Sequence, residues 1–194
     1  MAPLKARLAS GNAHKLAELR QALPGWELGL LEARRFPPEH GATYLENARA
    51  KALYGRAHAG AAEWVLGEDS GIEAVALGGG PGIESARWSE DGVARMLAEL
   101  ENFEDRRARY VCELVAISPV GEEVRATGVL EGTITRAPRG SEGFGYDPIF
   151  VPDGETRTVA ELGTAWKQQR SHRARAAAAL RAALELDLLG DENS

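Results

Sequence analysis

The sequence predicts an α/β fold with a mixed β-sheet, and two observations support this fold class. Alternating strand and helix patterns occupy roughly the first half of the chain, and such β-α-β units favour parallel strands. Polar and apolar residues then alternate over Arg107–Ser118 and Glu122–Thr133, on either side of a Pro-Val-Gly turn, which predicts a long antiparallel hairpin. Residues 1–194 are long enough for a single domain with one core or two lobes.

A strand, a short turn and a helix open the chain. The strand is predicted at Arg7–Ala9, and the helix at Ala13–Leu23, where leucines share one face before a Pro-Gly stop. The free N–H groups and the dipole at the start of a helix favour an anion there, and Lys15 adds a positive charge. The spacing is not that of a P-loop, and Asn12 capping the helix beside an exposed Lys15 explains the pattern equally well. The turn consists of Ser10, Gly11 and Asn12.

The next elements are a strand at Trp26–Leu31 and a helix from Thr43 to about Ala61. Thr43 and Glu46 fit a capping box, which explains the Glu46 carboxylate. Glu39 has no such explanation. It lies on a proline-braced loop and is either solvated or held there to meet a ligand.

An acidic pair follows the next predicted strand, Trp64–Leu66. We expect Glu68, Asp69 and Ser70 to lie on a turn that Gly71 makes possible. Adjacent carboxylates repel each other unless a cation lies beside them, and Mg²⁺ takes oxygen ligands while leaving room for phosphates. The alternative is a strand end with a solvated acidic turn. A further helix is predicted over Asp91–Leu100.

The stretch GSEGFGYDPIF, Gly140–Phe150, combines glycines with aromatic residues, which suggests that its backbone comes close to a ligand. Phe144 and Tyr146 could stack on a planar base, and Asp147 could accept a hydrogen bond from a ring N–H or a sugar hydroxyl. The competing interpretation is a tight β-bulge with buried aromatic residues.

A cluster of polar residues precedes the last predicted helix, which runs from its N-cap Ser171 to about Leu189. His172 and Arg173 fall in the first turn, where cations oppose the helix dipole. Residues placed against local preference are candidates for function, here for gripping an anion or a purine carbonyl group. His172 could equally be an ordinary solvated residue.

Composition limits the class of partner. The formal net charge of −6 and the pI near 5.4 argue against a nucleic acid polymer or an anionic membrane as the partner. The single cysteine, Cys112, lies in an apolar run and fits a packing role in the reducing cytoplasm. No stretch is long and apolar enough to span a bilayer, so we expect a cytoplasmic protein.

Five of these motifs follow one another in order along the chain. They are SGNAHK at Ser10–Lys15, Glu39 before TYLENARAKA, EDSGIEAVALGGGPGIESAR, GFGYDPIF, and Lys167 with SHR. On these motifs the chain resembles the inosine triphosphate pyrophosphatase family, also called HAM1-like, over nearly its full length. Members of this family remove ITP, dITP and XTP from the nucleotide pool.

The resemblance implies an α/β fold with a long central mixed sheet, flanking helices and two lobes around a nucleotide cleft. It also implies a homodimer and a magnesium-dependent reaction. In that reaction the bond between the α- and β-phosphates of a purine nucleoside triphosphate is hydrolysed, which releases the monophosphate and pyrophosphate.

The resemblance assigns roles to individual residues. Asp69 would be the general base, and Glu39, Asp69 and Glu68 would hold Mg²⁺. The residues expected to bind substrate are Ser10, Gly11, Asn12 and Lys15 for the triphosphate, Ser70 for the nucleotide, Phe144, Gly145, Tyr146 and Asp147 around base and sugar, Lys167 at phosphate or base, and His172 with Arg173 at the purine 6-keto edge.

Three positions depart from the family pattern. Glu68 stands where the family more often has aspartate, Glu84 stands where an aromatic residue is common, and His40 is an unusual neighbour of Glu39. The sequence leaves two other functions open: a Maf-like pyrophosphatase that acts on pyrimidine or methylated nucleotides, and a nucleotide-binding protein without catalysis. The SHR and FGYD motifs argue against the first, and Asp69 beside a metal site argues against the second.

Overall fold

The computed structural model describes residues 3–33 and 35–191, with side chains as far as residue 185. Its strands form one six-stranded sheet in the order β2-β1-β3-β4-β5-β6, so the α/β class with a mixed sheet is confirmed. The chain divides into two compact units. The first comprises Met1–Asp69, Cys112–Gly128 and Arg173–Ser194, and the second comprises Ser70–Val111 and Val129–His172.

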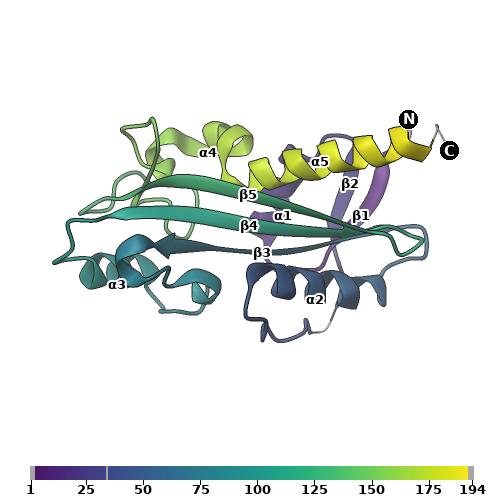
Figure 1. Cartoon of the computed structure of the whole chain (residues 1–194), viewed down its shortest axis with the longest axis horizontal. Coiled ribbons are helices and arrows are strands. Elements are labelled where there is room, and N and C mark those ends of the chain that lie inside the picture. The colour runs from purple at the N-terminus through teal and green to yellow at the C-terminus, as the bar shows by residue number, and fades with distance from the viewer. Residues whose placement is uncertain (1–2, 34, 192–194) are drawn as a thin grey trace. The chain divides into compact units, whose positions relative to one another are not determined.

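The first unit begins with β1 (Leu4–Leu8), α1 (Ala13–Ala22), β2 (Trp26–Leu30) and α2 (Tyr44–Arg56). β1 pairs in parallel with both β2 and β3 (Trp64–Ala74). Within this unit, α2 and α5 (His172–Asp191) cover opposite faces of the sheet (Figure 1). Their partners on β4 (Arg107–Ile117) alternate accordingly: alanines of α2 pack on Val115 and Ile117, and Ala176, Ala177 and Leu180 of α5 pack with Leu114 and Ala116.

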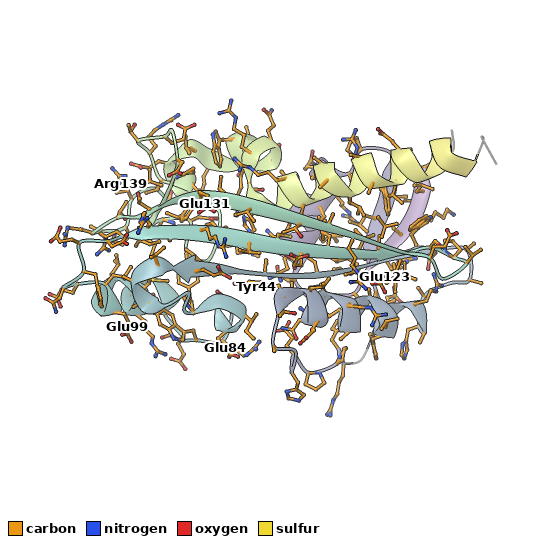
Figure 2. All side chains as sticks on the ribbon, viewed as in Figure 1. Tyr44, Glu84, Glu99, Glu123, Glu131 and Arg139 are labelled. Carbon is orange, nitrogen blue, oxygen red and sulfur yellow. The ribbon has the colours of Figure 1, made fainter. Side chains whose placement is uncertain are left out.

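Side chains of α2 and of β5 (Glu123–Ile134) meet in this unit. Tyr44 is the first residue of α2 and is buried, and Glu123 is the first residue of β5 (both are labelled in Figure 2). Arg49 of α2 forms an ion pair with Glu123, with 2.8 Å between nitrogen and oxygen. This exposed pair contributes little to stability, so packing of the small residues of α2 on the sheet holds the helix in place.

The second unit contains the remaining parts of β3, β4 and β5, together with α3 (Gly92–Glu99), β6 (Phe150–Pro152) and α4 (Val159–Arg170). β6 pairs antiparallel with β5. Two short 3₁₀ turns, Val75–Leu77 and Gly82–Glu84, follow β3. The core of this unit joins Ile72, Met96, Leu100, Tyr110, Leu130, Ile149 and Phe150.

Two local predictions were wrong, and two elements were missed. The helix expected to reach Ala61 ends at Arg56, because Ala57 caps it and the Arg56 guanidinium binds the Gly60 carbonyl oxygen at 2.6 Å. The turn expected at Glu68-Asp69-Ser70 is the middle of the continuous strand β3. β6 and α4 were not predicted, although Thr158 and Glu161 form a capping box at the start of α4.

Candidate active site

The turn before α1 is held by its own polar side chains. The Asn12 side-chain oxygen accepts hydrogen bonds from the backbone N–H groups of His14 and Lys15, at 2.9 and 3.2 Å, and so caps the helix. The Ser10 hydroxyl oxygen accepts from the backbone N–H of Asn12 at 3.1 Å. A Cβ atom added at Gly11 would lie 3.8 Å from the Phe36 ring, which is an ordinary van der Waals contact. These hydrogen bonds hold the turn at the start of α1, with Lys15 in the first turn of the helix.

Lys51 of α2 brings together two of the predicted acidic residues. Its ammonium group contacts a carboxylate oxygen of Glu39, and it lies 2.8 Å from Oδ1 of Asp69. It also donates to the backbone carbonyl of Glu68 at 3.1 Å. Asn47 donates to Oδ2 of Asp69 at 3.1 Å. A cavity of about 170 Å³ is lined by Glu39, Asn47 and Lys51 together with the proline loop.

The charges of this group shift its pKa values. Burial raises the pKa of Asp69, and the negative charge of Glu39 raises it further, while Lys51 acts in the opposite direction. Burial alone would lower the pKa of Lys51, but Asp69 and Glu39 outweigh it and the pKa of Lys51 rises. Lys51 is thus a cation at neutral pH, and Asp69 is more basic than a solvated aspartate.

Glu68 faces away from this pair. Its carboxylate is completely buried, and it contacts Lys15 and Arg173. Burial alone would lower the pKa of Arg173, but Glu68 and Glu18 raise it, so this guanidinium keeps its charge. Within the described residues, no three His, Cys, Asp or Glu side chains are grouped so as to hold a metal ion. The predicted three-carboxylate set of Glu39, Asp69 and Glu68 is therefore not formed, whereas the pair Glu39 and Asp69 is.

In the second unit, Asp147 is the acceptor for three donors. These are the backbone N–H of Phe144 at 2.8 Å, the ammonium group of Lys167 at 2.6 Å and the hydroxyl of Tyr110 at 3.3 Å. Lys167 also lies 4.0 Å from the centre of the Phe144 ring, in a cation–π contact. Asp147 thus fixes the glycine-rich loop from inside, and Phe144 is left half-buried.

Tyr146 and Gly145 differ in their surroundings. Tyr146 is buried in the core of the second unit, and its hydroxyl donates to the Ser85 carbonyl oxygen at 3.1 Å. This matches the interpretation of a buried aromatic residue rather than a base-stacking one. Gly145 is exposed and has a φ of 61°, a left-handed conformation that favours glycine.

His172 and Arg173 are neighbours in the chain that belong to different units and have different partners. The His172 ring stacks on Tyr110 with 4.6 Å between ring centres and 8° between planes. Because the Tyr110 hydroxyl also reaches Asp147, one tyrosine contacts two predicted site residues. Ser70 lies half-buried on β3.

Sequence reasoning missed Lys51, Asn47 and Tyr110. A signal existed for the first two, because they lie on the buried stripe of α2 that also contains Ala48, Ala52 and Gly55, where a lysine is out of place. Tyr110 follows the ordinary alternation of a strand, so nothing local distinguishes it from a core residue.

Comparison with known proteins places these residues in a family. The model of the Ham1 family matches residues 6–183. The chain belongs to the Ham1 family. A dITP/XTP pyrophosphatase of Deinococcus deserti is 43% identical to this Ham1 chain over 183 residues, which cover 91% of this chain and 87% of the relative. One from Thermus thermophilus is 42% identical over 193 residues, covering 94% and 91%.

Solved structures of Ham1 proteins share the fold. The Staphylococcus aureus Ham1 protein has a TM-score of 0.83 at 33% identity, with 94% of this chain and 99% of that chain covered. A HAM1 protein from Coxiella burnetii has a TM-score of 0.80 at 33% identity, with 94% and 98% covered. The Ham1 fold and the family predicted from the five motifs are therefore confirmed.

Proposed function

We propose that this Ham1 chain hydrolyses ITP, dITP and XTP between the α- and β-phosphates and releases the nucleoside monophosphate and pyrophosphate. The curated relatives named as dITP/XTP pyrophosphatases support this substrate class. The observation that carries the proposal is the buried contact of Lys51 with Asp69 and Glu39, beside a cavity. Two carboxylates that share one cation beside a cavity are suited to phosphate chemistry, whereas a packing role would not require these charges.

Mg²⁺ is the cofactor that we propose. The donor set fits, because Glu39 and Asp69 offer carboxylate oxygens around a single point where the Lys51 ammonium group already lies. When bound, Mg²⁺ supplies positive charge for the phosphates and lowers the pKa of nearby water. We also propose that the protein is a cytoplasmic homodimer that binds neither a nucleic acid polymer nor a membrane. Across the part of the chain that the structure describes, no helix has the length and apolar character to cross a bilayer.

The chain's own residues divide the reaction between them. Asp69 accepts a proton from the attacking water at a carboxylate oxygen. Asn47 and Lys51 orient that carboxylate. Lys15 and the N–H groups at the start of α1 hold the negative phosphates. Phosphoryl transfer depends chiefly on positioning and charge neutralisation, so these groups together with Mg²⁺ would be sufficient.

Base recognition falls to the second unit in this proposal. Phe144 offers an aromatic face, Lys167 a donor to phosphate or base, and His172 a donor to the 6-keto oxygen. Arg173, which the resemblance also assigned to the 6-keto edge, is buried and pairs with Glu68 and Glu18 instead. An adenine base carries an amino group in place of the 6-keto oxygen and would leave the His172 donor unpaired. Sites built on hydrogen bonds reject such an analogue by up to ~10⁴-fold.

The test is pyrophosphate release from ITP, dITP, XTP, GTP, ATP and dTTP, each with Mg²⁺ and with EDTA. We expect magnesium-dependent release from ITP, dITP and XTP. Preference for dTTP would point to a Maf-like enzyme, and no release from any of the six would point to a protein that only binds nucleotides.

Asp69→Asn tests the assigned base directly. We expect turnover to fall by at least about a thousandfold while nucleotide binding stays measurable, because the loss removes a group needed only in the transition state. Asp105→Asn is the matched control, since its carboxylate is exposed and pairs with Arg107. Near-normal rates for Asp69→Asn would show that another group removes the proton.

A further inference from the structure

Glu68 lies between two cations that come from different elements of the first unit. Its carboxylate is 2.6 Å from the Lys15 ammonium group, and Arg173 approaches it with Nε at 3.1 Å and Nη2 at 2.9 Å. Its side chain has no exposed surface, and that of Arg173 is 2% exposed. An ionised carboxylate buried to this degree is tolerated only with such partners.

The group is balanced in charge. Arg173 also pairs with Glu18, which lies one turn after Lys15 on α1, so two cations meet two carboxylates. The Cys112 thiol lies 3.6 Å from Glu68, and burial together with the Glu68 charge raises its pKa well above the ordinary value, so it stays neutral. An added metal ion at Glu68 would face the positive charges of Lys15 and Arg173 at close range.

We infer that Glu68 is a positioning residue that holds Lys15 in place, and not a ligand of the metal. The inference rests on the proposed function only in taking Lys15 as the group that meets phosphate. The length of glutamate matters, because aspartate is shorter by one methylene, or about 1.5 Å, and could not keep both contacts. The carboxylate nearest in sequence, Asp69, contacts Lys51 instead.

Calorimetry with Mg²⁺ alone tests whether Glu68 binds metal, and it needs no turnover. Glu39→Gln should raise the Kd for Mg²⁺ by at least about tenfold, because a charged ligand is lost. Glu68→Gln should raise it by less than about threefold, through the more distant change in charge alone. An increase as large as that of Glu39→Gln would overturn the inference.

Binding of inorganic pyrophosphate in EDTA tests the positioning of Lys15. Glu68→Asp keeps the charge of the cluster but shortens the arm, so Lys15 must be ordered anew on binding, and the Kd for pyrophosphate should rise about fivefold. In a Lys15→Met background the same change should alter the Kd by less than about twofold, because its effect passes through Lys15. Equal effects in the two backgrounds would overturn the inference.

A fold control accompanies these measurements. The double variant Lys15→Met with Glu68→Gln removes one cation and one anion and leaves the Arg173–Glu18 pair, so the cluster stays neutral. If Glu68→Gln alone does not fold, the double variant takes its place in the Mg²⁺ titration. Its Kd for Mg²⁺ should match that of Lys15→Met. A double variant that loses Mg²⁺ binding relative to Lys15→Met would again identify Glu68 as a ligand. Both binding assays give answers whether or not the wild type hydrolyses a nucleotide.

Discussion

Replacing Asp147 by asparagine should destabilise the protein strongly, although it hardly changes the size of the side chain. Asp147 is 2% exposed and its partner Lys167 is 5% exposed. The variant removes the carboxylate charge that lies 2.6 Å from the Lys167 ammonium group. It also weakens the hydrogen bonds from Tyr110 and from the backbone of Phe144.

The size of the effect follows from this geometry. Breaking a buried ion pair by removing one partner costs about 3–5 kcal/mol. Asparagine keeps one oxygen that can accept from the Phe144 N–H, so we expect the lower end, about 3 kcal/mol. For a chain of this length, 1 kcal/mol shifts the melting temperature by roughly 2–4 °C, which predicts a fall of about 6–12 °C.

Thermal unfolding followed by circular dichroism measures this fall. Asp153→Asn is the matched control, since Asp153 is exposed in the same unit and should stay within about 0.5 kcal/mol of wild type. Adding Lys167→Met to Asp147→Asn removes the stranded cation and should restore part of the stability. A melting temperature of Asp147→Asn within about 1 °C of the control, which corresponds to at most about 0.5 kcal/mol, would refute the reasoning.

Two further predictions concern α2. Lys51→Ala leaves Glu39 and Asp69 without their shared cation, so the melting temperature at neutral pH should fall by roughly 5 °C. Adding Mg²⁺ should raise the melting temperature of this variant by more than it raises that of wild type. No recovery would speak against a metal at these carboxylates. Gly67→Ala would place a Cβ 1.9 Å from the Ala48 carbonyl oxygen and 2.6 Å from the Ala52 nitrogen, so we expect a loss of about 1–3 kcal/mol in urea unfolding. An unchanged urea midpoint would mean that α2 moves away freely.

Local pattern predicted most of the fold. Leucine spacing and the Pro-Gly stop placed α1 within a residue, and strict alternation placed β4 and β5. Asn12 caps α1, and Thr43 caps α2, as the residue types suggested. These features depend on neighbours within a few residues, so the sequence contains the information directly.

The strand through Glu68 and Asp69 shows where local pattern failed. The sequence predicted a turn at these two adjacent carboxylates, yet both are buried on the continuous strand β3. The strand can continue through both carboxylates because each one has a cationic partner from elsewhere in the chain. Asp69 pairs with Lys51, and Glu68 pairs with Lys15 and Arg173. No window of sequence around β3 contains those cations.

By itself, the sequence determined the fold class, the family motifs and the residues capable of phosphate chemistry, because residue type and short spacing carry that information. Only the tertiary structure decided how the charges pair: it joins Lys51 to Glu39 and Asp69, encloses Glu68 between Lys15 and Arg173, and turns Asp147 inward to Lys167. The physical reason is that the stability of a buried charge depends on partners brought close by folding, and those partners lie as many as 105 residues away in the chain.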